Sequence, residues 1–184
     1  SMFLIEPNGE TFIHNKDIPT QFENRYYRDG DARRNCGIYG LALCWEMLRT
    51  KTIRELGKTT KVVLAGSCWW GLPEGSQDLE LKEYNEILCH ETPRQFAAIA
   101  GIPVVHSSLK GSIVGHRNLR SNEQVKRPLI GTCQIVDAKG NVVSSIGDND
   151  EDAVLVEELE LGKREIRKPG NDFWLVDLRE EYMK

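Results

Sequence analysis

No stretch of the 184-residue sequence approaches the roughly 20 consecutive apolar residues that cross a bilayer, and the first residues lack the basic-then-apolar pattern of a signal peptide. Nor is there a cluster of Lys and Arg of the kind that follows a phosphate backbone, because 24 basic residues are set against 28 acidic ones, for a net charge of −4. These absences argue against membrane and nucleic-acid partners. They predict a soluble, cytoplasmic protein.

Cysteine never occurs in Cys-x-x-Cys spacing; its five copies are at positions 36, 44, 68, 89 and 133. The odd number and the spacing argue against a disulfide framework and a zinc site, so we expect reduced thiols and no metal. Cys89 and His90 are neighbours that point in different directions in either regular structure, which disfavours a shared metal site. With 40% hydrophobic residues, the chain can bury one core, and we expect a single domain over residues 1–184.

Hydrophobic patterning predicts an α/β fold. The turn at residues 7–10 separates two short β-prone runs and predicts a hairpin, Phe3–Glu6 with Thr11–His14. Buried strands are expected over 37–44, 61–65 and 102–106, with helices over 45–56 and 79–100, the second of them broken near Pro93. This alternation predicts right-handed crossovers and a sheet with ligands at the carboxyl ends of its strands.

The C-terminal third changes character. Strands are expected over 129–137, 142–146 and 153–160, as an antiparallel extension of the sheet. Residues 161–184 are charged but include Phe173, Trp174 and Leu175, which we expect to dock on the body or on a second subunit, because a small domain rarely leaves such groups in water.

Cys44 ends an apolar strand at the start of the predicted helix. A side chain at such a corner is exposed at the carboxyl edge of the sheet, where unpaired backbone N–H groups and the helix dipole favour thiolate over thiol. Glu46 and Arg49 are three residues apart on the same helix, and we expect an ion pair between them to anchor the corner. Cys44 is therefore the expected reactive residue of this protein.

Three features occur in one order along the chain: a lysine after a hairpin strand, a cysteine at a strand-to-helix corner, and a Trp-Trp pair after the next strand. Together they resemble the carbon-nitrogen hydrolases of the nitrilase and amidase superfamily. The matching stretches are Lys16-Asp17-Ile18-Pro19 with Glu23-Asn24, Gly40-Leu41-Ala42-Leu43-Cys44-Trp45-Glu46, Gly66-Ser67-Cys68-Trp69-Trp70, and residues 131–140.

The resemblance implies roles for particular residues. Cys44 is the expected nucleophile, Lys16 the cation that stabilises the tetrahedral intermediate, and Glu23 the accessory glutamate beside the lysine. The backbone N–H of Trp45 is an expected donor to the developing charge, and Trp45, Trp69 and Trp70 are the expected substrate-binding side chains. The family further implies part of a four-layer α-β-β-α sandwich, a homodimer and no cofactor.

The family's general base is a glutamate from a strand well before the lysine. Only Glu6 and Glu10 precede Lys16, and both flank the hairpin turn, so the resemblance implies the C-terminal two-thirds of the family fold without the N-terminal third. Three interpretations stay open: an N-terminal piece completes the site, Glu23 substitutes as base, or this chain alone is inactive.

The expected reaction is cleavage of a non-peptide carbon-nitrogen bond in a small molecule through a cysteine thioester. The proline that follows Cys-Trp-Glu in nitrilases is absent after Glu46, which favours an amide over a nitrile. One alternative is a non-catalytic binding or assembly module, suggested by the missing base. Another is a Cys/His hydrolase or glutaminase in which His106 activates Cys44, although Leu43 and Trp45 stand where glutaminase elbows have glycines.

Overall fold

The computed structural model describes residues 1–20, 23, 26–31, 33–116, 122–147 and 153–162. Its elements are β1 (Met2–Ile5), β2 (Thr11–His14), β3 (Asn35–Cys36), β4 (Tyr39–Leu43), the 3₁₀ turn η2 (Cys44–Leu48), α1 (Thr50–Glu55), β5 (Val62–Ser67), α2 (Leu79–Ala100), β6 (Val104–Ser108), β7 (Gly111–His116), β8 (Gln124–Leu129), β9 (Cys133–Val136) and β10 (Val142–Ile146). None of the helices described there is long and apolar enough to cross a membrane.

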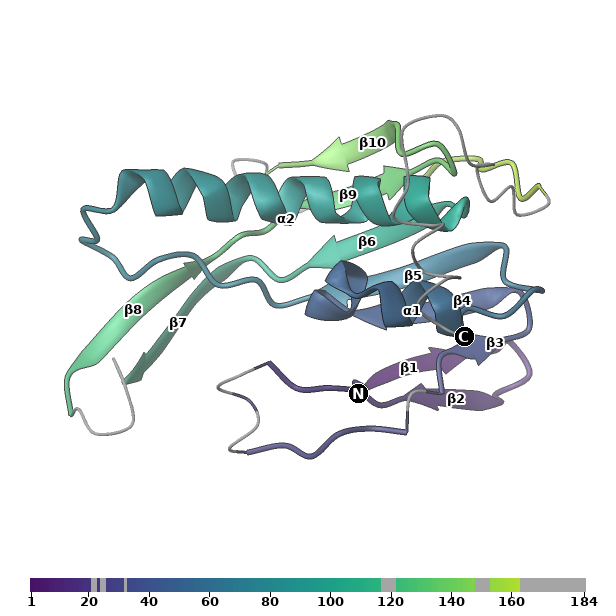
Figure 1. The fold of residues 1–184 in the computed structure, drawn as a ribbon, viewed down its shortest axis with the longest axis horizontal. Helices are drawn as coiled ribbons and strands as arrows, with labels where there is room; N and C mark the ends of the chain where they lie inside the picture. The colour runs from purple at the N-terminus through teal and green to yellow at the C-terminus, as the bar shows by residue number, and fades with distance from the viewer. Residues whose placement is uncertain (21–22, 24–25, 32, 117–121, 148–152, 163–184) are drawn as a thin grey trace, which may run out of the picture.

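The main sheet has the strand order β10-β9-β6-β5-β4-β3 and places β4, β5 and β6 side by side in parallel (Figure 1). The strands β3, β9 and β10 each pair antiparallel with their neighbours. Two separate hairpins, β1–β2 and β7–β8, lie beside this sheet, and the latter extends away from it. The predicted α/β class and the antiparallel extension by β9 and β10 are confirmed.

The helices bury one face of the sheet. Phe96, Ala97 and Ala100 of α2 pack with Val63 and Val104 in a core that excludes water almost completely. Strand alternation sends the neighbouring side chains to the opposite face, where Leu64 and Val105 pair in register and are only half-buried. The prediction of a four-layer sandwich would place a second sheet on that face, and it stays a prediction.

The predicted hairpin, the strands near 61–65 and 102–106 and the long helix are all present. Among the predictions for these particular elements, only the break expected near Pro93 is wrong, because α2 continues to Ala100. A proline inside a helix costs about 3 kcal/mol. The helix around it buries Cys89, Phe96, Ala97 and Ala100. A buried Phe side chain alone contributes about 1.5–3 kcal/mol, and the other buried apolar groups add to this, so their combined packing offsets the local defect.

The helix expected over 45–56 is instead two short pieces. Arg49 separates η2 from α1 with extended backbone angles, φ −103° and ψ 126°. Its guanidinium donates to the Asp17 carboxylate at 2.8 Å and to the Ile18 carbonyl at 2.9 Å. These contacts with the segment after β2 hold the side chain where a continuous helix would not place it.

Three expectations for the C-terminal third need correction or fall outside the description. The strand expected over 129–137 is divided between the end of β8 and β9, and the hairpin β7–β8 was not predicted. Residues 153–160 form no strand, and Val154 and Val156 are more than four-fifths exposed, so their alternating pattern has no partner strand in the described part of the chain. Phe173, Trp174 and Leu175, and the docking expected of them, lie outside the described residues.

Candidate active site

Cys44 occupies the corner where β4 ends and η2 begins. Its φ of +53° is the only positive value among the non-glycine residues that the structure describes. Left-handed backbone at a side chain with a Cβ costs of order 1–3 kcal/mol, and such strain gathers at functional sites. The sequence suggested the corner but gave no sign of this conformation.

Lys16 follows β2 and lines the same cavity as Cys44. The cavity has a volume of about 870 Å³, and Glu23, Cys68 and Ser107 contribute to its wall. The Lys16 ammonium donates to the Glu23 carboxylate at 2.6 Å, and both side chains are mostly buried. Lys16, Glu23 and Cys44 therefore come together from three segments of the chain.

Burial raises the pKa of the Cys44 thiol, and this outweighs the opposing influences of Lys16 and of hydrogen bonds from the backbone of Cys68 and Trp45. The sequence-based expectation that the corner alone favours thiolate is therefore wrong, because the desolvation at a half-buried site exceeds what a five-residue 3₁₀ turn offers. At neutral pH the resting sulfur is a thiol. It needs a proton acceptor before it can attack.

The Glu23 carboxylate is held in its charged form. Burial alone would raise its pKa, but hydrogen bonds from the Lys16 ammonium and from Thr20 outweigh burial and lower it. Asp31, another acid at the edge of the large cavity, also has a lowered pKa because Arg33 hydrogen-bonds to it. Neither acid is tuned to exchange a proton near neutral pH.

Glu46 and Arg49 do not pair with each other, contrary to the expected ion pair. Both instead bind Asp17: the Glu46 carboxylate accepts the Asp17 backbone N–H at 2.8 Å, and Arg49 donates to the Asp17 side chain. The fully buried Glu46 also accepts the Leu43 backbone N–H at 2.6 Å and contacts His14 Nε2 at 2.7 Å. One carboxylate thus fixes the residue before the cysteine and the residue after the lysine.

The three expected tryptophans line a second, smaller cavity. It measures about 270 Å³ and shares Lys16 and Cys44 with the larger one. Trp45 and Trp69 stack with ring centroids 5.9 Å apart and planes 17° from parallel. Trp69 is nearly inaccessible, whereas Trp45 and Trp70 are over one-third exposed. The cysteine therefore lies where an open cavity meets an aromatic one.

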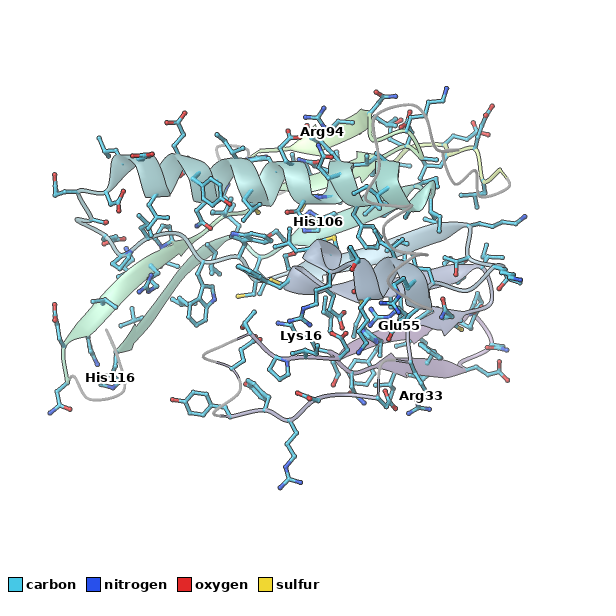
Figure 2. The ribbon with its side chains drawn as sticks, in the orientation of Figure 1. Lys16, Arg33, Glu55, Arg94, His106 and His116 are labelled. Atoms are coloured by element: carbon cyan, nitrogen blue, oxygen red, sulfur yellow. The ribbon has the colours of Figure 1, made fainter. Side chains whose placement is uncertain are left out.

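His106 is placed away from this group. Strand register sets it level with Ala65 and Ala42 on the helix-covered face, and Figure 2 shows it close to α2 with Lys16 nearer the β1–β2 hairpin. Its Nε2 lies 2.8 Å from the Ser67 hydroxyl, and it lines neither Cys44 cavity. Burial, with a smaller contribution from His90, lowers the pKa of His106 to about 4, so the ring is neutral.

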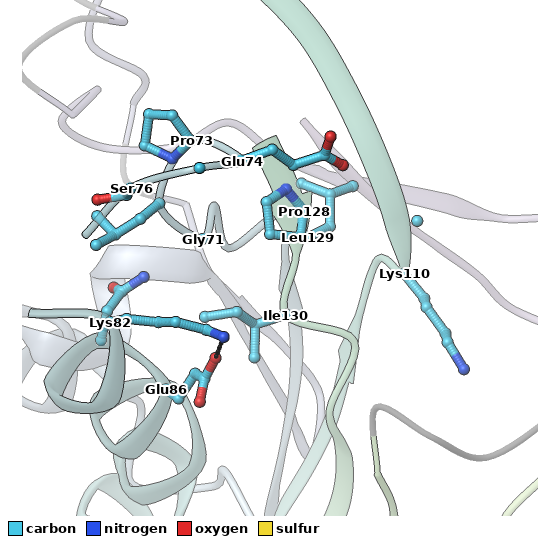
Figure 3. A pocket seen from close by; sticks show the side chains of 14 residues that line it. Gly71, Pro73, Glu74, Ser76, Lys82, Glu86, Lys110, Pro128, Leu129 and Ile130 are labelled. Carbon is cyan, nitrogen blue, oxygen red and sulfur yellow. Dashed lines mark ion pairs between the residues drawn. The ribbon is translucent and has the colours of Figure 1, made fainter. Parts of the chain in front are cut away.

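A third cavity, of about 420 Å³, lies between the 71–76 loop, the first half of α2 and the base of the β7–β8 hairpin (Figure 3). Lys82 and Glu86 face each other across one of its walls at 4.0 Å, and Pro128 and Ile130 form another. It contains neither Cys44 nor Lys16. In the described parts of the chain, no three His, Cys, Asp or Glu side chains group together to hold a metal ion.

Comparison with solved structures places this geometry in context, although no protein-family model and no curated protein matches the sequence. A carbon-nitrogen hydrolase from Helicobacter pylori G27 superposes with a TM-score of 0.66 at 21% identity, covering 81% of this chain and 52% of the other. A CN-hydrolase superfamily protein from Xanthomonas campestris, with an arsenic adduct in its active site, gives a TM-score of 0.55 at 14% identity over 81% and 53%. An amidase from Nesterenkonia sp. gives 0.52 at 13% identity over 80% and 50%.

The chain thus spans about half the length of the structures it matches, and most of its own length takes part in the match. Identities this low establish the fold and nothing finer. Over four-fifths of its residues, this chain therefore shares the fold of the carbon-nitrogen hydrolase structure from Helicobacter pylori.

Proposed function

We propose that this chain belongs to an enzyme that hydrolyses a small-molecule amide through a thioester on Cys44. The single observation that supports this most is the meeting of Cys44 with Lys16 in one cavity, at a strained corner that also brings backbone hydrogen bonds to the sulfur. The structural neighbours named as carbon-nitrogen hydrolases and an amidase support the same reaction class.

In the proposed reaction, the Cys44 sulfur bonds to the amide carbon and the carbonyl oxygen becomes an oxyanion. The Lys16 ammonium and the Trp45 backbone N–H stabilise that charge, since a fixed donor contributes most where charge develops in a water-poor site. The carbon–nitrogen bond then breaks as the amine takes a proton. Water attacks the thioester, releases the carboxylic acid and restores the thiol.

Glu23 serves in this proposal as the partner that holds and orients the Lys16 ammonium. Its lowered pKa makes it a weak base, and the raised pKa of Cys44 makes thiolate formation costly. We therefore propose that the general base of the complete enzyme is a carboxylate supplied from outside these 184 residues. Removing such a group commonly slows catalysis about 10²- to 10⁴-fold, so this chain alone should turn over slowly.

Acyl transfer to hydroxylamine tests the proposal. A short aliphatic amide such as butyramide should acylate Cys44, and hydroxylamine should release the acyl group as a hydroxamate whose formation requires Cys44. The activated ester 4-nitrophenyl butyrate should also acylate Cys44. Because nitrophenolate leaves easily, this reaction avoids the difficult departure of an amine. A Cys44→Ala chain that still forms an acyl adduct at the same rate, seen by intact mass, would contradict the proposal and favour the binding-module alternative.

A further inference from the structure

Arg127 contributes a positive charge to the aromatic cavity beside Cys44. It lies on β8, on the face opposite its neighbours Lys126 and Pro128, and lines the small cavity together with Trp45 and Trp69. No sequence pattern suggested a role for it.

The guanidinium has no acidic partner among the residues that the structure describes. Its one hydrogen bond there is a long contact of 3.4 Å from Nη1 to the Gly71 carbonyl oxygen. Glu74, an acid on the adjacent loop, forms an ion pair with Lys126 at 2.7 Å. Most of the fork of N–H donors on Arg127 is therefore unused, although this side chain is the one best suited to bind a carboxylate through two parallel hydrogen bonds.

The other polar groups of the cavity add no net charge, and most of them have a partner, although the buried Thr20 hydroxyl has none among the residues described. Lys16 is neutralised by Glu23 at 2.6 Å. Asn85 accepts from the Trp69 indole N–H at 2.9 Å and donates to the Trp70 carbonyl at 2.8 Å. Arg127 thus leaves the cavity with one net positive charge beside its aromatic walls.

The volume limits what can enter. About 270 Å³ is below the usual range for drug-sized ligands, so a chain of a few carbon atoms with a terminal carboxylate fits and a large group does not. The 870 Å³ cavity on the other side of Cys44 suits the departing amine and the entering water, which must exchange while the acyl group stays attached to sulfur.

We propose that Arg127 makes the site select amides whose acyl part ends in a carboxylate, such as the monoamide of a short dicarboxylic acid. This inference rests on the proposed function of Cys44. Arg127 binds the remote carboxylate, the indoles enclose the short methylene chain, and the scissile carbonyl reaches the sulfur. Without Arg127, the anion would be desolvated against aromatic rings with no partner, and binding would be lost.

The test compares two activated esters, mono-4-nitrophenyl glutarate and 4-nitrophenyl butyrate, by the rate at which each acylates Cys44 in the whole chain. Each acylation rate is divided by the rate at which the same ester acylates 2-mercaptoethanol, which corrects for the difference in intrinsic reactivity between the two esters. The Cys44→Ala chain gives the background rate of ester hydrolysis. We expect the wild-type chain to favour the glutarate, and Arg127→Gln to lower the glutarate-to-butyrate ratio about 10- to 100-fold, the range of a charged hydrogen bond. Lys126→Gln removes the same charge one residue away and should leave the ratio unchanged.

Each outcome decides one of the two proposals. A wild-type chain that is acylated faster by the butyrate overturns the role of Arg127, even if the Arg127→Gln chain does not fold. An equal loss of ratio in the two charge variants also overturns it, because the effect would then be general electrostatics. Acylation that does not depend on Cys44 with either ester overturns the proposed function and this inference with it.

Discussion

The Glu46 carboxylate accepts the backbone N–H of Asp17 at 2.8 Å and so joins the residue after Lys16 to the turn that begins at Cys44. The two proposed reacting groups are 28 positions apart in the sequence. Their relative placement therefore depends on a buried side chain that touches neither substrate nor sulfur in the proposed mechanism.

Glu46→Ala should destabilise the protein and slow acylation of Cys44 together. The substitution leaves His14 and Arg34 fully buried beside an empty site, and breaking a buried charged network commonly costs about 3–5 kcal/mol. Urea unfolding followed by circular dichroism measures the stability, and the nitrophenolate burst measures acylation. Glu83→Ala, at an exposed position of α2, should change neither by more than about 0.5 kcal/mol. Equal unfolding midpoints for the two variants would show that the Glu46 network does not support the site.

Gly30→Ala should disturb Lys16 by simple collision. Gly30 donates its N–H to the Lys16 carbonyl at 2.8 Å, and an added Cβ would lie 2.5 Å from that oxygen, so the backbone beside the lysine must move. We expect acylation of Cys44 to fall at least about tenfold, since displacements near 1 Å can cost about 10² in rate. Gly115→Ala, where a Cβ meets nothing within 4 Å, is the matched control. Unchanged acylation in the Gly30 variant would mean that Lys16 is not positioned through this contact.

The pH dependence of Cys44 alkylation should report its two charged neighbours with opposite signs. Burial raises the pKa of Cys44, Lys16 lowers it and Glu23 raises it, so Lys16→Met should move the midpoint of the rate profile to higher pH and Glu23→Gln to lower pH. Iodoacetamide labelling followed by peptide mapping resolves Cys44 from the other four thiols, and a short unstructured cysteine peptide gives the reference. A wild-type midpoint below the reference, or two shifts of the same sign, would contradict this description of the cavity.

Asn85→Ala should loosen the aromatic wall. Asn85 joins the indole N–H of Trp69 to the carbonyl of Trp70, and Trp69 is buried, so its N–H would lose its partner at a cost of about 1–3 kcal/mol. Asn85→Asp keeps the acceptor for Trp69 and loses the donor to Trp70, and should lie between the wild type and Ala in tryptophan fluorescence and thermal stability. If the Ala and Asp variants behave alike, the bond to Trp69 contributes nothing.

The sequence predicted the parts of this molecule that depend on local pattern. Periodicity located β5, β6 and both ends of α2, and the turn at residues 7–10 located the first hairpin. The sequence-based predictions failed where the structure depends on contacts between residues that are far apart in the sequence. Arg49 breaks the expected helix because Asp17 binds it, and residues 153–160 have strand composition but no partner strand.

The features of the candidate site also fall into those that the sequence predicted and those that only the structure shows. The order of Lys16, Cys44 and the Trp-Trp pair was visible in the sequence, and the structure places these residues around two adjoining cavities. The positive φ of Cys44, the direction of its pKa shift and the presence of Arg127 beside the tryptophans arise from three-dimensional packing. No spacing in the sequence relates residue 127 to residue 44.

The most direct test of the account is the burst of nitrophenolate from 4-nitrophenyl butyrate in Lys16→Ala and His106→Asn, each verified by circular dichroism and by the mass of the acylated Cys44 peptide. His106→Asn retains an amide able to hydrogen-bond Ser67. The proposed mechanism predicts a burst lowered about 10²- to 10³-fold without the lysine ammonium and nearly unchanged without the imidazole. A full burst without Lys16, together with a lost burst without His106, would contradict it.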